Sequence, residues 1–194
     1  MAGRFVGPRE FAARRRRLMR ALGPGSAAVF VAGSDSRRNG DVDHPFRQDS
    51  TFFYLTGFEE SEAVAVLRPG AKQPFTLLVR PHDPVQAVWV GPRAGVEGAC
   101  ATYGADQAFP IEELDQRLPE LLRGVKELHY SMGQTAPLAQ RVERALIGLV
   151  AARREGTQRG PCRWRRGATR SRWSTGSGCS KRRPKSRRCA RRST

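Results

Sequence analysis

Apolar residues fall along the chain in short clusters whose spacing alternates between that of helices and that of strands. Apolar positions three and four residues apart predict amphipathic helices, and short β-branched runs that stop at Gly or Pro predict buried strands. The predicted helices span residues 9–22, 111–122 and 136–150, and the predicted strands span 27–32, 51–55, 63–67, 75–79, 87–90 and 127–130. Residues 33–45 are predicted to form a loop. This order predicts an α/β fold, a mixed β-sheet flanked by helices, with neighbouring antiparallel strands.

Charge is distributed very unevenly along the 194 residues, whose formal net charge is +17 and mean hydropathy −0.55. Residues 1–158 hold 21 Lys and Arg against 18 acidic residues, a net charge of +3. Residues 159–194 hold 14 Lys and Arg and no acidic residue. Within the first helix, Arg14 to Arg17 are predicted to form a solvated face rather than a nucleic-acid patch. The body therefore has an ordinary globular composition, and the basic character belongs to a tail.

Several classes of protein are excluded by what the chain lacks. No apolar run approaches the roughly 20 residues of a membrane-spanning helix, and the arginine-rich first 22 residues have no apolar core of a secretory signal. Cys100 is alone in the body, while three more cysteines lie in the tail at spacings that match neither a disulfide framework nor a metal site. A cytoplasmic protein is expected.

Candidate chemistry is sparse in the body. His44, His82 and His129 occur in none of the usual catalytic or metal-binding spacings, and the first two adjoin prolines and are predicted to be turn residues. Acidic groups within 41–49 and 59–62 are predicted to serve loops and turns rather than a metal. Arg47 precedes an aromatic cluster and is expected to bond loop carbonyls and hold the strand entry. The alternative is a contact with substrate or another domain.

A family resemblance rests on several separated segments. PFRQDSTFFYLTGFEESEAVAVLRPG (45–70) resembles the hallmark of the N-terminal domain of Xaa-Pro aminopeptidases, also called aminopeptidase P, in the creatinase/prolidase superfamily. Residues 9–22 resemble the opening helix of that domain. PHDPVQAVWVGPRAGVEGA (81–99) and YGADQAFPIEELDQRLPELL (103–122) follow in the family's order. The resemblance spans about residues 8–157.

The resemblance implies that catalysis lies outside this chain. The family hydrolyses the bond before proline in a C-terminal domain that holds two divalent metals, usually manganese, and none of those ligands transfers to this sequence. The N-terminal domain packs on the catalytic domain and takes part in homo-oligomer contacts. By resemblance, Asp41, Arg47 and Trp89 are expected near the active-site mouth. Asp41 or Arg47 would hold the charged substrate terminus, and Trp89 would wall the pocket.

The tail gives the expected domain organisation: a folded domain over residues 1–157 and a disordered basic tail over 158–194. From Arg159 onward there is no Leu, Ile, Val, Phe or Met, so the tail has little apolar surface to bury. Three origins remain open: a nonspecific nucleic-acid arm with Trp164 and Trp173 as stacking residues, a natural extension, or translation out of frame. GC-rich codons for 178–194, read from the third base, give LLKTPAEIEALRAAID, which resembles the first helix of the family's catalytic domain. This predicts a frameshift near Gln158-Arg159.

Overall fold

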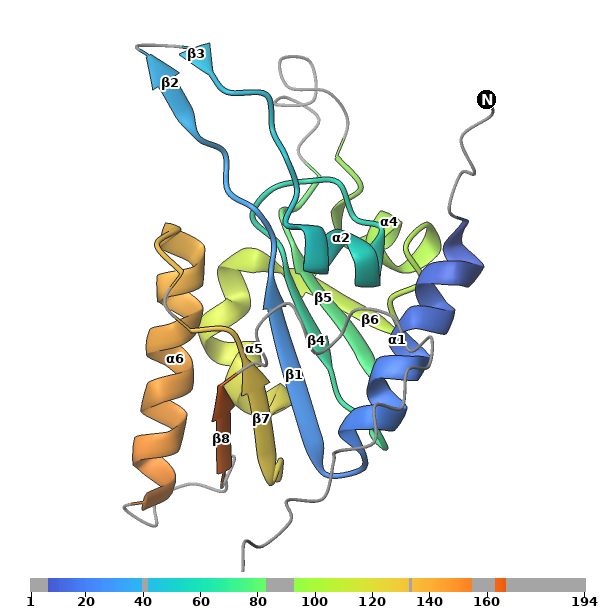
Figure 1. The fold of residues 1–194 in the computed structure, drawn as a ribbon, viewed down its shortest axis with the longest axis vertical. Helices are drawn as coiled ribbons and strands as arrows, with labels where there is room; N and C mark the ends of the chain where they lie inside the picture. The colour runs from blue at the N-terminus through green and yellow to red at the C-terminus, as the bar shows by residue number, and fades with distance from the viewer. Residues whose placement is uncertain (1–6, 40–41, 83–92, 133, 155–162, 167–194) are drawn as a thin grey trace, which may run out of the picture.

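A six-stranded mixed sheet forms the centre of the computed structural model, which describes residues 7–39, 42–82, 93–132, 134–154 and 163–166 (Figure 1). The strand order is β6-β5-β4-β1-β7-β8. The strands are β1 (Ser26–Val31), β4 (Val64–Leu67), β5 (Phe75–Val79), β6 (Gln107–Pro110), β7 (Glu127–Tyr130) and β8 (Arg163–Arg166). The pairs β1–β4 and β4–β5 are antiparallel, whereas β1–β7, β5–β6 and β7–β8 are parallel. The expected fold class is therefore confirmed.

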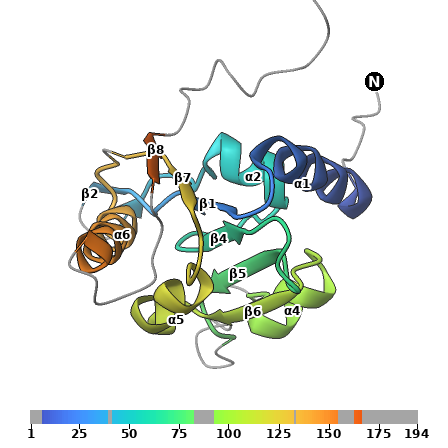
Figure 2. The same cartoon turned by 90° about the horizontal axis from the view of Figure 1, so that it is seen from below.

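Helices cover both faces of this sheet, as the view along it shows (Figure 2). They are α1 (Pro8–Leu22), α2 (Ser50–Thr56), α4 (Gly95–Ala101), the 3₁₀ turn η1 (Ile111–Glu113), α5 (Leu114–Leu121) and α6 (Pro137–Arg154). One apolar core lies between the sheet and the helices α5 and α6, and a second lies against α1, α2 and α4. Successive strand residues point to opposite faces, so β1 sends Ala27 and Val29 into the first core and Ala28 into the second. A strand buried on both faces needs the continuous apolar run that β1 has.

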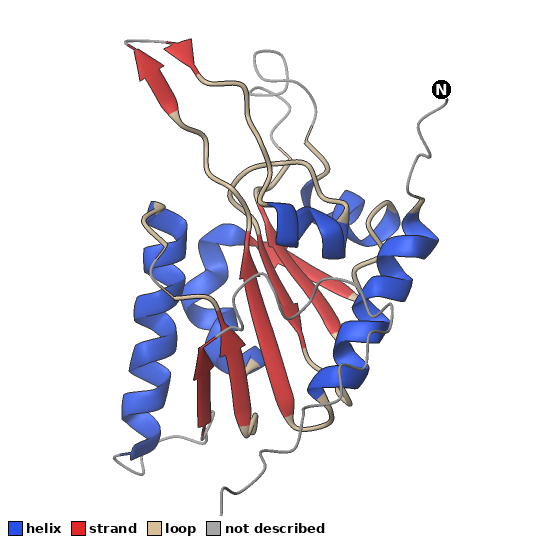
Figure 3. Ribbon diagram, in the orientation of Figure 1, coloured by secondary structure: helices blue, strands red, loops and turns tan. Residues whose placement is uncertain are grey.

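Two short strands leave the body of the molecule. Strands β2 (Arg37–Asn39) and β3 (Val42–Asp43) pair with each other as a separate hairpin that stands away from the main sheet (Figures 1 and 3). The sequence predicted only a loop over 33–45, because these residues lack the apolar alternation of a packed strand.

The predicted strand over residues 51–55 is wrong, because this segment is helix α2. Both carboxylate contacts of Asp49 cap the helix: the N–H groups of Thr51 and Phe52 donate to Oδ1 at 2.8 and 2.9 Å. An aspartate at the N-cap satisfies helix donors that otherwise have no partner. Gly57 ends the helix in the left-handed conformation, at φ 69°. Local capping therefore outweighs the β-propensity of the aromatic run.

The basic run of helix α1 is also only partly the solvated face that was expected. Arg16 and Arg17 are exposed, but Arg15 is buried with 5% of its surface accessible. Its guanidinium donates to the carbonyl of Leu55 at 3.1 Å and lies 4.0 Å from the centroid of the Phe75 ring. Burial lowers the pKa of Arg15 to about 10, an effect that the nearby Asp106 partly offsets.

Most of the remaining predicted helices and strands are present in the structure. The strands over 27–32, 63–67, 75–79 and 127–130 and the helices over 9–22, 111–122 and 136–150 are confirmed with small shifts of their ends. Pro119 lies inside α5, which is only eight residues long. Helix α4 was not predicted, and the predicted strand over 87–90 lies outside the described residues.

The tail differs from expectation in its described part. Of residues 158–194 the structure describes only 163–166, and these form β8 at the edge of the sheet, not a segment without regular structure. Within the described part of the chain, no helix is both long and apolar enough to cross a membrane.

Candidate functional site

The three candidate residues have different outcomes. Arg47 lies exposed in the loop that leads from β3 into α2. Asp41 and Trp89 lie outside the described residues, so their predicted positions stay predictions. The segments that carry them do have described ends: Asn39 and Val42 flank the first, and His82 and Arg93 flank the second. The hairpin, the Arg47 loop and the ends of the Trp89 segment all lie at the end of the sheet drawn uppermost in Figure 1.

Gln48 organises this end of the sheet. Its Oε1 accepts hydrogen bonds from the N–H groups of Gly33 at 2.6 Å and Asp49 at 2.9 Å. Its Nε2 donates to the carbonyls of Phe58 at 3.1 Å and Glu60 at 2.8 Å. The side-chain amide thus joins the end of β1, the start of α2 and the loop that precedes β4. Both of its donors and both acceptor positions are in use.

The role expected of Arg47 therefore belongs to its neighbour. Arg47 was expected to bond loop carbonyls, and Gln48 is the residue that does so. The backbone of Arg47 is held instead by close packing, since a Cβ added to Gly33 would lie 2.9 Å from the Arg47 carbonyl oxygen. A fixed backbone with an exposed side chain is the arrangement of a residue that can contact a partner. Sequence reasoning missed Gln48 because a polar loop residue gives no sign of its bonding partners.

Glu60 extends the network toward the Trp89 segment. Its Oε1 accepts a hydrogen bond of 2.7 Å from the N–H of Ala94. Nearby, Nδ1 of His82 lies 3.0 Å from the carbonyl oxygen of Arg93, so the two ends of segment 83–92 are held together. Burial raises the pKa of Tyr103, and the negative charges of Glu60 and Glu59 raise it further. The carboxylates of Glu59 and Glu60 therefore disfavour a further negative charge on the neighbouring Tyr103.

A second network fixes the base of the hairpin. Arg80, which follows β5, donates through Nε to Glu62 at 2.8 Å, and its Nη1 lies 3.8 Å from Asp35. The hydroxyl of Ser61 donates to the same Asp35 carboxylate at 2.7 Å. Glu62 has a positive φ of 54°, a conformation that non-glycine residues seldom adopt. The ion pair and the bond from the Glu62 N–H to the Gly33 carbonyl, 3.2 Å, hold it there.

Three acidic residues of these two groups make structural contacts. Asp49 caps α2, Glu62 pairs with Arg80, and Glu60 binds a backbone N–H. The backbone N–H of His44 donates to the carbonyl of Ser36 at 2.8 Å, beside the hairpin, so this bond links the two arms that enter the hairpin and does not form a turn. Among the described residues, no three His, Cys, Asp or Glu side chains come together as a set of metal ligands.

Exposed aromatic residues lie beside this network. Phe46 precedes Arg47, and Phe53 and Tyr54 lie on the outer side of α2, with 37%, 37% and 43% of their surfaces accessible. Phe53 packs edge-on against Phe11 of α1, with the ring centroids 5.8 Å apart. The Arg14 guanidinium lies 4.2 Å from the Tyr54 ring centroid. The exposed residues that precede and lie on α2 are here called the α2 face: Phe46, Arg47, Phe53 and Tyr54.

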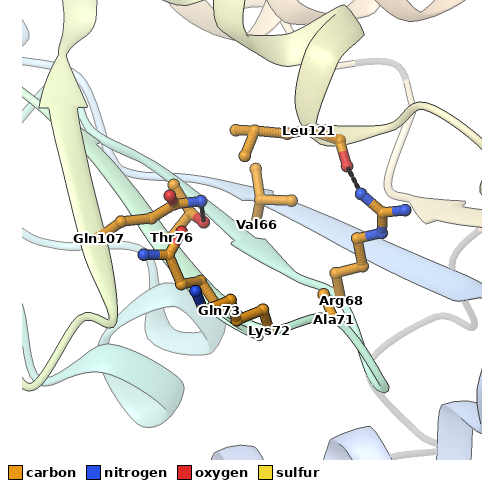
Figure 4. Close-up of a pocket in the computed structure, with 8 residues that line it drawn as sticks. All are labelled: Val66, Arg68, Ala71, Lys72, Gln73, Thr76, Gln107 and Leu121. Atoms are coloured by element: carbon orange, nitrogen blue, oxygen red, sulfur yellow. Dashed lines mark hydrogen bonds between the residues drawn. The ribbon is translucent and has the colours of Figure 1, made fainter.

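A shallow hollow lies at the other end of the sheet, around the turn between β4 and β5. Figure 4 shows its lining, in which Arg68 points to the end of α5 and donates to the carbonyl of Leu121 at 2.8 Å. Another nitrogen of Arg68 donates to the carbonyl of Arg123 at 2.7 Å. Arg68 therefore satisfies carbonyls that the helix end leaves free. None of the candidate residues lines this hollow.

The comparisons with known proteins agree with this architecture. The family profile described as "Aminopeptidase P, N-terminal domain" matches residues 11–130. The chain is 38% identical over 122 residues to a Xaa-Pro aminopeptidase of Haemophilus influenzae, a match that covers 62% of this chain and 28% of that protein. A Xaa-Pro aminopeptidase of Escherichia coli is 35% identical over 133 residues, covering 68% of this chain and 30% of the relative.

Solved structures give the same answer. The aminopeptidase PepP of Pseudomonas aeruginosa superposes with a TM-score of 0.76 at 38% identity, over 83% of this chain and 36% of that one. Aminopeptidase P from E. coli, solved with the inhibitor Pro-Leu, gives 0.74 at 31% identity, over 83% and 37%. Fold and sequence thus define a domain found as the N-terminal part of longer aminopeptidases. The chain belongs to the aminopeptidase P N-terminal domain family. It spans about three tenths of the length of the curated relatives it matches.

Proposed function

We propose that this chain is the non-catalytic N-terminal domain of a bacterial-type Xaa-Pro aminopeptidase. The observation that carries the proposal is the match of residues 11–130 to the N-terminal domain family, together with relatives named for that activity. In the whole enzyme the domain would pack against a catalytic domain and take part in contacts between subunits. Alone, the chain would not hydrolyse Xaa-Pro peptides.

The α2 face is the proposed contact with the catalytic domain. Exposed aromatic residues beside an arginine with a fixed backbone are typical of a protein–protein contact, since interface cores are enriched in aromatic residues and Arg. The catalytic domain is the occupant to which we commit, because the relatives extend well beyond the segment that this chain matches. The family resemblance supports the same choice.

Asp41, Arg47 and Trp89 are proposed to lie at the mouth of the substrate channel, of the same or a neighbouring subunit. Gln48 and Glu60 support this assignment, since they link the Arg47 loop to the end of the Trp89 segment. In this arrangement Arg47 would bind a substrate carboxylate, Asp41 would bind an amino terminus, and Trp89 would form a wall. A guanidinium pairs with a carboxylate through two parallel hydrogen bonds.

Two manganese ions, held by the catalytic domain, would supply the activated water for hydrolysis. The described residues of this chain offer no ligand set for them, so no step of that reaction is assigned to this chain. A cytoplasmic location is proposed with the function.

A domain graft tests the proposal. Residues 1–157 replace the corresponding domain of the P. aeruginosa relative, and release of the first residue from an Xaa-Pro peptide is measured with Mn²⁺. We expect an active chimera in which Arg47→Ala raises KM about tenfold, the effect of removing an interaction of about 1.4 kcal/mol. Arg17→Ala, which removes an exposed arginine of α1, is the control and should leave KM unchanged.

Two results would contradict the proposal. Hydrolysis by the 194-residue chain alone with Mn²⁺ would place catalysis in this domain. Equal KM values for the Arg47→Ala chimera and its parent would remove Arg47 from the substrate channel.

A further inference from the structure

The edge strand β8 has an unusual sequence for its position in the sheet. Its residues are Arg-Trp-Arg-Arg, and its register places Trp164 beside Leu128 and Arg166 beside Tyr130. Leu128 and Tyr130 are both buried in the core beneath α5 and α6. Paired positions of neighbouring strands lie on the same face of a sheet.

The genetic code links this segment to a different reading frame. The codons of Trp and Cys all begin with the bases TG. When reading starts at the third base of each codon, such a residue becomes a codon that ends in TG, which encodes Leu, Met or Val whichever synonymous codon is used. The tail between residues 159 and 194 contains five of these residues: Cys162, Trp164, Trp173, Cys179 and Cys189. A segment with no Leu, Ile, Val or Met thus gains five residues that are Leu, Met or Val in the displaced frame.

The same displacement removes the positive charge of each arginine whose codon begins with CG. An Arg codon that begins with CG becomes a codon for Ser, Pro, Thr or Ala, and a Ser codon that begins with TC becomes one for Phe, Leu, Ile or Val. In the other alternative frame every Trp codon becomes a Gly codon, so Trp164 and Trp173 gain no aliphatic side chain there. This difference at the two Trp positions depends on the code and not on a choice of codons.

The displaced residues also fit the periodicities of regular structure. Aliphatic residues would stand at 162 and 164, the alternation of a strand, and 164 is the position in register with Leu128. Further along, LLKTPAEIEALRAAID over 179–194 would place apolar residues at 186, 189 and 193, the spacing of a helix face. A single shift of the reading frame therefore produces both the spacing of a strand and the spacing of a helix.

We propose that codons 159–194 are read out of frame and that the shift lies before codon 162, so that the native edge strand beside β7 is encoded in the displaced frame. The occupant that fits the edge of β7 is then this chain's own continuation, with Leu, Met or Val at 162 and 164. The basic tail is not a native element, and nucleic-acid binding is not its role. The genetic code and the register of β7 with β8 support this proposal, so the result of the domain graft neither supports nor contradicts it.

Nucleotide sequence and peptide mass spectrometry test the proposal directly. We expect codons 159–194 of the gene in the source organism to be open in the displaced frame, and tryptic peptides of that frame to occur in the protein isolated from it. A displaced-frame peptide supports the proposal whether or not WSTGSGCSK (173–181) accompanies it. A stop codon in the displaced frame, or WSTGSGCSK with no displaced-frame peptide, overturns it.

Paired variants of the 194-residue chain test the strand itself. Trp164→Val with Arg166→Ala introduces displaced-frame residue types at the two positions beside Leu128 and Tyr130 and should raise the urea midpoint. The control is Arg163→Ala with Arg165→Ala, which also substitutes two residues of β8, at the positions beside Glu127 and His129. Equal midpoints for the two pairs would contradict the assigned register.

Discussion

The backbone N–H of Gly33 donates a hydrogen bond of 2.6 Å to Oε1 of Gln48, fifteen residues further along the chain. Through this contact the end of β1 is fixed to the loop that carries Arg47. The Nε2 of the same side chain fixes that loop to the carbonyls of Phe58 and Glu60. Gly33 itself allows the close approach, since any larger residue would meet the Arg47 carbonyl.

Replacing Gln48 by Glu should destabilise the protein by about 2–4 kcal/mol, because buried carbonyls lose their donors and face a carboxylate instead. Urea unfolding of the full chain measures the loss. Gln73→Glu, at an exposed position in the hollow at the other end of the sheet, makes the same chemical change and should stay within about 0.5 kcal/mol of the parent. In Gln48→Leu, hydrogen exchange at the Gly33 N–H should also accelerate. Similar losses for Gln48→Glu and Gln73→Glu would show that the amide does not hold this end of the sheet.

Arg15 joins helix α1 to the second core by polar contacts. Besides Leu55, its Nη2 reaches the carbonyls of Tyr103 at 3.5 Å and Gly104 at 3.4 Å. Arg15→Met keeps most of the packing volume but removes every donor, so the unfolding free energy should fall by about 2–4 kcal/mol. Arg16→Met, one position along on the exposed side, should change it by no more than about 0.5 kcal/mol. If denaturation curves of the two variants coincide, Arg15 contributes no more than a solvated arginine.

Strands with a buried apolar run could be predicted from the sequence, because burial on both faces requires that composition. β1, β4 and β5 are recovered for this reason. Helix α2 could not be, since its aromatic run suits a strand equally well and the deciding contact is the Asp49 cap. The sequence does contain the capping residue, so the signal was present but was outweighed by β-propensity.

The candidate site shows the same division between local and long-range information. Arg47 could be selected from a family resemblance, but the long-range bonds that hold its loop join residues 10 to 15 positions apart. Arg15 was misjudged for a related reason: a run of four arginines on an amphipathic helix does not reveal which one faces α2 and β5. Such contacts depend on the packed structure, and periodicity alone does not identify them.

Alkaline pH should destabilise the protein through Tyr130. Its hydroxyl donates to the carbonyl of Ala139 at 3.0 Å, and burial, with a smaller effect from Glu143, raises its pKa to about 12. Between the unfolded value near 10 and about 12, the unfolded state releases this proton and the folded state keeps it. Stability is therefore fully present below pH 10 and falls by up to about 1.4 kcal/mol per pH unit above it.

Tyr130→Phe separates this contribution from other alkaline effects. At pH 8 the variant should be about 1 kcal/mol less stable than the parent, because it lacks the bond to Ala139. At pH 11 the difference should shrink or reverse, as measured by urea midpoints at both pH values. Tyr54→Phe, which removes an exposed hydroxyl, should keep the same difference from the parent at pH 8 and pH 11. A constant offset for Tyr130→Phe would be evidence against the raised pKa.

Two glycine-to-alanine substitutions should have opposite effects on stability. Gly57 ends α2 with φ +69°, and a Cβ there would lie 2.5 Å from the Phe11 ring, so Gly57→Ala should cost about 1–3 kcal/mol through strain and repacking. Gly148 lies at an exposed position of α6, where an added methyl group would meet nothing within 4 Å beyond its chain neighbours and the backbone of its own helix, so Gly148→Ala should stabilise by about 0.5–1 kcal/mol. Thermal unfolding of both variants beside the parent gives the two signs. A stabilising Gly57→Ala would mean that α1 does not pack on the end of α2, and with it the link between Phe11 and the α2 face would be lost.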